Sequence, residues 1–191
     1  MCIYFEYQLY RGNRTHKFNA EHFQAFQSSN YPILAEAGVH LKYNYTALKK
    51  AEAKKLKVHT NLDPNIIILK LFPGITKEVV NAVLGIKNLK AIILETYGSG
   101  NASTQKWFID SIKNAIDKGL VVLNVTQCNA GKVEQGKYAT SASFSSIGVI
   151  GGNDITTEAA VAKLMYVLGN SANKKEIKKM LESDLRGEIT A

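Results

Sequence analysis

Ile66-Ile67-Ile68-Leu69-Lys70-Leu71-Phe72, closed by Pro73-Gly74, is the stretch that decides the fold of this chain of 191 residues. It is short and almost uninterruptedly apolar, and two similar runs follow at residues 91–94 and 120–123. Runs that lack polar alternation are typical of strands buried on both faces, as in a parallel sheet. A weaker fourth run covers residues 147–150.

Helical patterns separate most of these runs. Residues 76–84 follow the first run, with Thr76 as a suitable N-cap. Residues 108–116 carry apolar side chains on one helical face after the second run. We expect a loop between the third and fourth runs, and two helices afterwards, near 161–168 and 173–185. This order predicts an α/β fold: a small doubly wound parallel sheet flanked by helices, with right-handed crossovers.

The chain ahead of the sheet has a different texture. Residues 2–10 alternate and predict one half-buried aromatic strand, with Ile3, Phe5, Tyr7 and Leu9 on one face. Gly12-Asn13 should end it, and short helical signals follow. Residues 44–64 are rich in lysine and alanine. We therefore expect an incomplete N-terminal arm at 1–43, an interdomain linker at 44–64 and a C-terminal α/β domain at 65–191.

Composition narrows the class of protein. Apolar residues make up 46% and charged residues 21%, which is typical of a globular chain. We expect no membrane span and no secretory signal, and so a cytoplasmic location. Cys2 and Cys128 are the only cysteines and lack metal-site spacing, so no metal or cofactor is expected. The net charge of +8 sits largely in lysine clusters without interleaved aromatics, which favours a solvated surface over nucleic-acid binding.

Residues with chemical potential lie where the predicted strands end. Tyr97-Gly98-Ser99-Gly100-Asn101 leaves the second strand, and its glycines allow the backbone to approach a ligand closely. An ordinary strand-to-helix turn explains this spacing equally well. Cys128 follows the third strand, where a cysteine is either a nucleophile or, more commonly, a small apolar side chain. Lys17 follows the aromatic strand and the Gly12-Asn13 turn. Only this position in the sequence distinguishes it from the other lysines of the chain.

Taken together, the sequence resembles the bacterial-type L-asparaginases, in particular the cytoplasmic type I branch. The matching segments run in family order across nearly the whole chain, and the ordered set is specific although no single motif is decisive. They are residues 2–5, 9–15, 72–75, 97–102, 124–128, 131–133, 136–140, 148–152 and 185–188.

The resemblance implies hydrolysis of L-asparagine to L-aspartate and ammonia by a threonine nucleophile. Family members carry that threonine in a T-G-G-T stretch, and a second threonine in T-D-T that works with an aspartate and a lysine. Lys17 matches the catalytic lysine, whereas this sequence contains neither T-G-G-T nor T-D-T. The chain would then start late in the N-terminal domain and be inactive alone.

The resemblance also implies roles for residues of the C-terminal domain. Asn101 matches an asparagine that binds substrate in the neighbouring subunit. Cys128 matches one residue of a regulatory asparagine site found in some type I enzymes. Glu95 and His16 stand where that site has an arginine and a threonine. A carboxylate cannot replace a guanidinium as a clamp for a substrate carboxylate, so regulation in that manner is not expected.

Two further expectations remain open at this stage. The family implies a homo-oligomer, a dimer or a tetramer, and an unpaired aromatic strand edge would also invite association. The alternative to a part of an enzyme is a non-catalytic amino-acid-binding or oligomerisation module that shares the domain.

Overall fold

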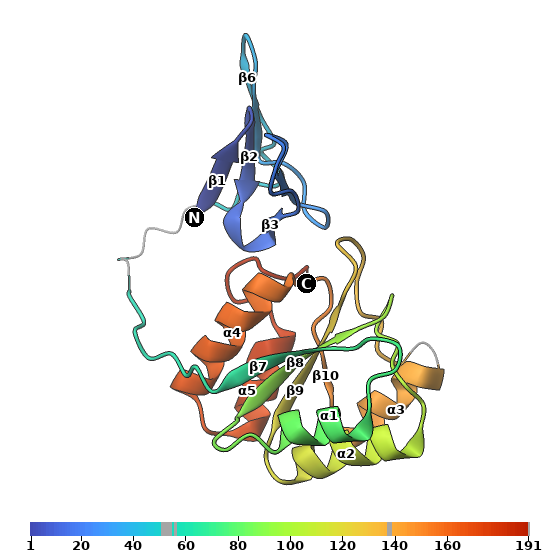
Figure 1. Cartoon of the computed structure of the whole chain (residues 1–191). Coiled ribbons are helices and arrows are strands. Elements are labelled where there is room, and N and C mark those ends of the chain that lie inside the picture. The colour runs from blue at the N-terminus through green and yellow to red at the C-terminus, as the bar shows by residue number, and fades with distance from the viewer. Residues whose placement is uncertain (51–54, 56, 137–138, 191) are drawn as a thin grey trace. The chain divides into compact units, whose positions relative to one another are not determined.

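The computed structural model describes residues 1–50, 55, 57–136 and 139–190, and it contains two compact units. Unit 1 runs from Met1 to Thr60 and unit 2 begins at Asn61 (Figure 1). Within the described residues, no helix has both the length and the apolar character needed to cross a membrane.

Unit 2 confirms the predicted α/β class. Its four parallel strands lie in the order β10-β9-β8-β7 and are flanked by helices on both faces (Figure 1). The strands are β7 (Ile66–Lys70), β8 (Ala91–Thr96), β9 (Val121–Thr126) and β10 (Ile150–Gly151). The helices are α1 (Lys77–Leu84), α2 (Lys106–Asp117), α3 (Ala139–Ile147), α4 (Thr157–Asn170) and α5 (Lys174–Glu182).

The two faces of the sheet build two separate apolar cores. Side chains along β8 alternate between them: Ala91 and Ile93 pack with residues of α4 and α5. Ile92 and Leu94 pack on the other face with residues of α1, α2 and α3. All four side chains are 0% exposed. Helices on both faces are therefore the reason that this stretch shows no polar alternation.

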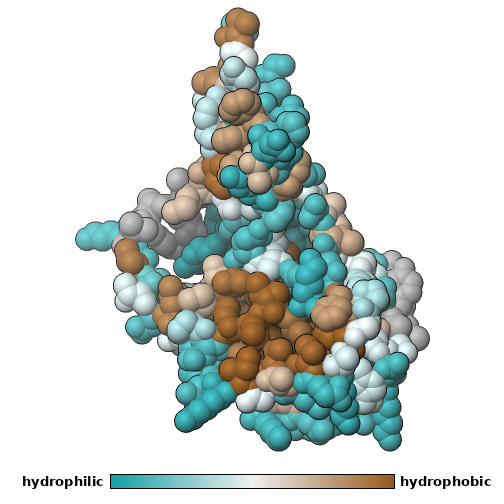
Figure 2. Space-filling model, in the orientation of Figure 1, coloured by the Kyte–Doolittle hydropathy of each residue, from teal (hydrophilic) through white to brown (hydrophobic). Residues whose placement is uncertain are grey.

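Two expectations for the sheet were wrong in part. The segment before the fourth strand is not a loop throughout but contains α3. The large side chain that α3 buries is Phe144, and this helix is otherwise rich in serine. The sequence of α3 therefore shows no repeated apolar stripe. The strand β7 is not buried on both faces, because it lies at the edge of the sheet and Ile68 is 43% exposed. Figure 2 shows apolar surface gathered around this edge strand.

Unit 1 is a small antiparallel structure. One sheet has the strand order β1-β2-β5-β6, and β3 and β4 form a separate pair. The strands are β1 (Cys2–Phe5), β2 (Gln8–Arg11), β3 (His16–Lys17), β4 (Phe26–Gln27), β5 (Ala35–Ala37) and β6 (Leu41–Tyr43). The short 3-10 helix η1 (Gly12–Arg14) follows β2, as the expected break at Gly12-Asn13 requires.

The prediction of one strand over residues 2–10 was wrong, because β1 and β2 form a hairpin. Glu6 and Tyr7 turn the chain with φ angles of 47° and 64°. Such two-residue turns normally carry Asn-Gly or a similar pair, so the sequence gives no turn signal here. The hairpin places Tyr10 opposite Ile3, on one face, and Tyr10 is buried. The helical signals in residues 19–43 also give strands and loops rather than helices.

The first residues after β6 pack against the strands and loops of unit 1 that precede them. Ala47 is buried, and its carbonyl oxygen accepts hydrogen bonds of 2.9 Å from Arg11 Nη2 and from the hydroxyl of Tyr31. The Arg11 guanidinium also lies 3.9 Å from the centre of the Tyr31 ring. These contacts tie the beginning of the lysine-rich segment to the antiparallel sheet.

Candidate functional site

The turn that follows β8 is closed by backbone hydrogen bonds at the carboxyl edge of the sheet. Tyr97 N donates to Asn101 O over 2.9 Å, and Asn101 N donates to Tyr97 O over 2.8 Å. Gly98 and Gly100 have φ angles of 49° and 107°. An added Cβ at Gly100 would lie 2.8 Å from Val133 Cγ1. Both the left-handed backbone and the close contact therefore require glycine at position 100.

Thr126, the last residue of β9, fastens this turn to the next loop. Its hydroxyl donates to Gly98 O over 2.5 Å and accepts from Cys128 N over 3.0 Å. One side chain thus holds the turn that ends at Asn101 and the loop that carries Cys128. Thr126 belongs to the matching segment 124–128, but no local pattern in the sequence indicates that its hydroxyl joins the two loops.

A second, fully buried contact supports the same turn from inside. Thr96 Oγ1 donates to Asn124 Oδ1 over 2.6 Å, and Asn124 Nδ2 donates to Gly100 O over 3.4 Å. Thr96 and Asn124 are both 0% exposed. This pair was not predicted, although one asparagine within an otherwise apolar strand is a signal in the sequence. A buried amide needs partners, and here the partners belong to the turn.

These contacts decide how Asn101 is presented. It is partly exposed and stands at the end of a turn held by Thr126 and Asn124. A side-chain amide contains both donor and acceptor groups, which are the types that bind amino and carboxylate groups. The hydrogen bonds of the turn fix the backbone that carries this side chain at the carboxyl edge of the sheet.

Glu95 lies elsewhere at the same edge. Its Oε1 accepts from Thr157 Oγ1 over 2.6 Å, and its Oε2 lies 3.7 Å from Lys70 Nζ. The side chain is 12% exposed. Because Thr157 begins α4, the carboxylate also faces the positive end of a helix dipole. The carboxylate is therefore committed to contacts within unit 2, and neither of these two contacts involves Cys128.

Cys128 itself is exposed. The four histidines of the chain all precede residue 61, so unit 2 offers its thiol no histidine partner. Among the described residues, no group of three His, Cys, Asp or Glu side chains is placed to hold a metal ion.

Lys17 and His16 lie in unit 1, on β3. His16 pairs with Gln27 and Lys17 with Phe26 on β4. Lys17 is exposed, and its Nζ lies 5.9 Å from the centre of the Phe26 ring. The residue before this strand, Thr15, is buried and donates from Oγ1 to Arg11 O over 2.7 Å. The catalytic candidate is thus presented on the surface of unit 1 by a short, anchored strand.

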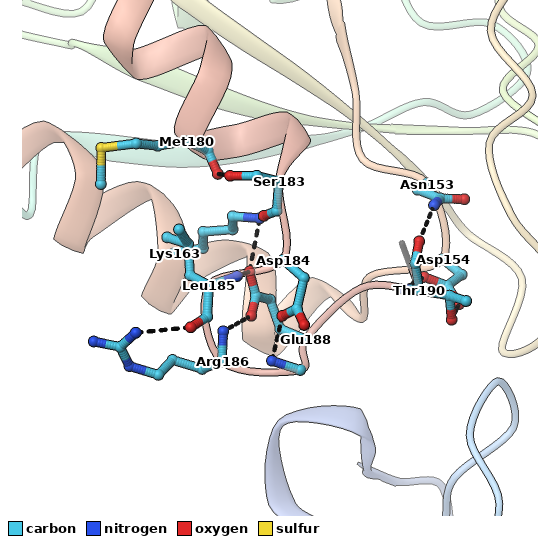
Figure 3. Close-up of polar contacts among 11 residues, drawn as sticks. Asn153, Asp154, Lys163, Met180, Ser183, Asp184, Leu185, Arg186, Glu188 and Thr190 are labelled. Carbon is cyan, nitrogen blue, oxygen red and sulfur yellow. Dashed lines mark hydrogen bonds and ion pairs between the residues drawn. The ribbon is translucent and has the colours of Figure 1, made fainter. Parts of the chain in front are cut away.

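A network of polar contacts that was not predicted from the sequence holds the C-terminal turn of unit 2 (Figure 3). Lys163 Nζ on α4 lies 2.7 Å from Glu188 Oε1 and donates to Ser183 O over 2.6 Å. The backbone N–H groups of Leu185 and Arg186 donate to the Glu188 carboxylate over 3.0 Å and 2.6 Å.

Two opposing effects act on the Glu188 carboxyl. Burial raises its pKa. The hydrogen bonds from Lys163 and from backbone N–H groups outweigh burial and lower the pKa to about 2.

The last described residues are attached at the carboxyl end of β10. Asp154 is buried and follows that strand. Its carboxylate accepts from Thr190 N over 2.8 Å and from Thr190 Oγ1 over 2.5 Å. Asn153 Nδ2 donates to Thr190 O over 2.7 Å. The end of the described chain is therefore part of the edge that also carries the Tyr97–Asn101 turn.

Comparison with known proteins gives two family matches. The model of the glutaminase/asparaginase C-terminal domain matches residues 65–181, and the model of the N-terminal asparaginase domain matches residues 1–49. L-asparaginase 1 of Escherichia coli strain K12 is 42% identical over 190 residues, which cover 100% of this chain and 56% of that protein.

Two further relatives agree over the full chain. The 60 kDa lysophospholipase of Mus musculus is 40% identical over 192 residues, covering 100% of this chain and 34% of that protein. The crystal structure of L-asparaginase I from Vibrio cholerae has a TM-score of 0.92 and 38% identity, covering 100% of this chain and 57% of that one. The chain thus spans little more than half the length of these two bacterial asparaginases and about a third of the lysophospholipase.

The match to the C-terminal model alone covers more than half of the chain, and the fold agrees with a solved asparaginase over its whole length. The resemblance inferred from the ordered segments is therefore confirmed. The chain belongs to the L-asparaginase family and carries a C-terminal asparaginase domain preceded by a portion of the N-terminal one.

Proposed function

We propose that this chain supplies part of an L-asparaginase that hydrolyses L-asparagine to L-aspartate and ammonia in the cytoplasm. The observation that carries the proposal is the hydrogen-bonded Tyr97–Asn101 turn, held by Thr126 and Asn124 in a chain that matches the asparaginase C-terminal model. The turn presents a side-chain amide where the fold places ligands, at the carboxyl edge of a parallel sheet.

In this reaction a threonine hydroxyl attacks the side-chain amide carbon of asparagine. The C–N bond breaks, ammonia leaves, and water then hydrolyses the ester to release aspartate. Lys17 is this chain's contribution to the catalytic group in which a threonine, an aspartate and a lysine work together. The chain contains neither T-G-G-T nor T-D-T, so both threonines and the aspartate must come from another stretch of polypeptide. We expect the 191 residues alone to be inactive.

The remaining site residues have narrower roles in this proposal. Asn101 serves the active site of a neighbouring copy in a homo-oligomer. The regulatory positions Cys128, Glu95 and His16 do not bind asparagine in the manner of some relatives. Two arguments support this. The Glu95 carboxylate already contacts Thr157 and Lys70. A carboxylate at this position would also repel the carboxylate of an amino acid, which an arginine would attract.

A covalent chimera tests the proposal. The part of E. coli L-asparaginase 1 that lies outside the matched stretch is fused ahead of Met1, and ammonia release from L-asparagine is measured. The chimera should turn over asparagine, whereas the unfused chain and a chimera with Lys17→Met should not. A folded chimera without activity, or rapid turnover by the unfused chain, would show that the proposed function is wrong.

A non-catalytic module that binds an amino acid remains the second candidate. The absence of both threonine motifs from the sequence favours it. Calorimetry distinguishes the two hypotheses. Saturable binding of L-asparagine by the unfused chain would support a non-catalytic binding module, and the absence of a heat of binding would support a part of an L-asparaginase.

A further inference from the structure

A hollow of about 390 Å³ lies at the amino edge of the parallel sheet of unit 2. It is lined by Lys90 and Leu120, which lead into β8 and β9, so it lies at the opposite end of these strands from the Tyr97–Asn101 turn. The helices α1, α2 and α4 also end at this edge. Pockets for small ligands commonly have volumes of about 300–1,000 Å³. The hollow is therefore large enough to hold a small molecule.

The walls of the hollow are mainly apolar. Six larger apolar side chains line it: Leu84, Leu89, Leu120, Val121, Leu168 and Ile177. The three leucines at 84, 89 and 120 belong to the apolar core on one face of the sheet, and the other three belong to the core on the opposite face. The hollow thus lies where the two cores meet beyond the start of the strands, and it offers an apolar ligand contacts with both.

The charged side chains of the hollow are cationic. Lys90, Lys118 and Lys174 line it, and none of the other described residues that line it is an aspartate or a glutamate. Lys90 is already paired, since its Nζ lies 2.5 Å from Asp63 Oδ2. Within the described part of unit 2, Lys118 and Lys174 belong to no ion pair. An anion bound at the rim would therefore meet two ammonium groups that have no carboxylate partner.

Helix dipoles account for only one of these two lysines. Lys118 follows α2 directly, where the negative end of the helix stabilises a cation. Lys174 is the first residue of α5, where a cation faces the positive end of the helix and is unfavourable. The position of Lys174 thus brings no benefit within α5, but it places a second cation beside the apolar hollow.

We propose that this hollow binds a small amphiphile that has an apolar chain and one carboxylate, such as octanoate. The chain packs against the apolar walls, and the carboxylate lies at Lys118 and Lys174. A neutral apolar molecule would leave these two cations without a partner, and a very short carboxylate would leave the walls uncovered. The binding site is independent of the proposed hydrolysis of asparagine.

Calorimetry on the complete chain of 191 residues tests both parts of the ligand. Octanoate should bind saturably at one site. Hexanoate, which is two methylene groups shorter, should bind about tenfold more weakly, because it buries less apolar surface. Octylammonium has the same alkyl chain with the opposite charge and should show no saturable binding. Equal affinities for octanoate and either of the other two compounds would overturn the proposal.

Lys174 and Lys175 form a matched pair for locating the carboxylate. Both are exposed lysines in the first turn of α5, but only Lys174 lines the hollow. Lys174→Glu should weaken the binding of octanoate by about tenfold or more, because it sets two carboxylates against each other. Lys175→Glu makes the same change in net charge and should leave the affinity nearly unchanged. Equal weakening by the two variants would contradict the proposed site.

Hydrogen exchange on the unmutated chain locates the ligand without relying on how the variants fold. Peptides covering residues 84–90 and 115–121 should exchange more slowly with octanoate, and peptides covering residues 97–101 should not change. Unit 1 and β7 also expose apolar side chains, which an alkyl chain can contact non-specifically. Protection confined to those regions would overturn the assignment of the hollow as the binding site.

Discussion

Lys163 and Glu188 form an ion pair in the interior of unit 2, with Nζ 2.7 Å from Oε1 and side chains that are 3% and 6% exposed. The pair joins α4 to the turn near the end of the chain. The backbone N–H groups of Leu185 and Arg186 also donate to the carboxylate, so its acceptor positions are well used. Buried charges of this kind persist only with such complete pairing.

Removing one partner should therefore cost more than removing both. We expect Lys163→Met to lower the free energy of unfolding of unit 2 by about 3 kcal/mol, since it leaves the Glu188 carboxylate buried and unpaired. The double variant with Glu188→Leu should lose less than the sum of the two single variants. Urea denaturation followed by the fluorescence of Trp107, the only tryptophan, reports on unit 2. Strict additivity would contradict the pairing.

The same carboxylate predicts a dependence of stability on pH. The pKa of Glu188 falls from 4.5 to about 2 in the folded chain. A lowered pKa means that the folded state binds protons less readily than the unfolded state. The stabilisation is thus complete above about pH 4.5 and is lost as the pH falls towards 2. The difference in unfolding free energy between the natural chain and Glu188→Gln should shrink across that window and stay constant from pH 6 to 8. A constant difference down to pH 2 would be inconsistent with the lowered pKa.

Gly100 and Gly119 form a matched pair for testing the Tyr97–Asn101 turn. Their φ angles are 107° and 109°, but a Cβ at Gly100 meets Val133 at 2.8 Å, whereas one at Gly119 meets nothing within 4 Å. Gly119→Ala should cost about 1 kcal/mol from backbone strain. Gly100→Ala should cost about 1–3 kcal/mol more, because it also overpacks the contact with Val133. Equal losses in urea denaturation would show that the close contact is unimportant.

The sequence predicts unit 2 better than unit 1 for a physical reason. In β8 and β9 burial on both faces leaves long apolar runs, and the intervening helices α1 and α2 show clear periodicity. The hairpin of unit 1 instead depends on Glu6 and Tyr7 adopting left-handed backbone angles, for which neither residue type gives a signal. Alternation across the turn then imitates one longer strand.

The candidate site shows the same limit. Asn101 can be predicted as a candidate site residue from the sequence, because the glycines and the amide of its turn form a recognisable local pattern. The side chains of Asn124 and Thr126, which hold that turn, come from β9, and Asn124 lies 28 positions along the chain from Thr96. Lys163 and Glu188 are likewise distant in the chain and look like ordinary surface charges. Pairings of this kind depend on tertiary structure and carry no local pattern.

Thr126 offers a test of how the turn is held. Thr126→Val keeps the shape of the side chain but removes the hydroxyl that donates to Gly98 O and accepts from Cys128 N. We expect a loss of about 1–2 kcal/mol in the stability of unit 2. In the active chimera the KM for asparagine should rise with little change in kcat, because Asn101 would be held less firmly. A fall in kcat alone would indicate a different role for the turn.

Mixing two inactive chimeras tests whether Lys17 and Asn101 serve different subunits. One chimera carries Lys17→Met and the other Asn101→Ala, and each should lose most of its activity as a homo-oligomer. In a mixed dimer, one site combines the intact Lys17 of one chain with the intact Asn101 of the other. Random pairing of equal amounts makes half of the dimers mixed, each with one complete site out of two, so about a quarter of full activity should return. If both residues acted within a single chain, no site would be complete and no activity would return on mixing.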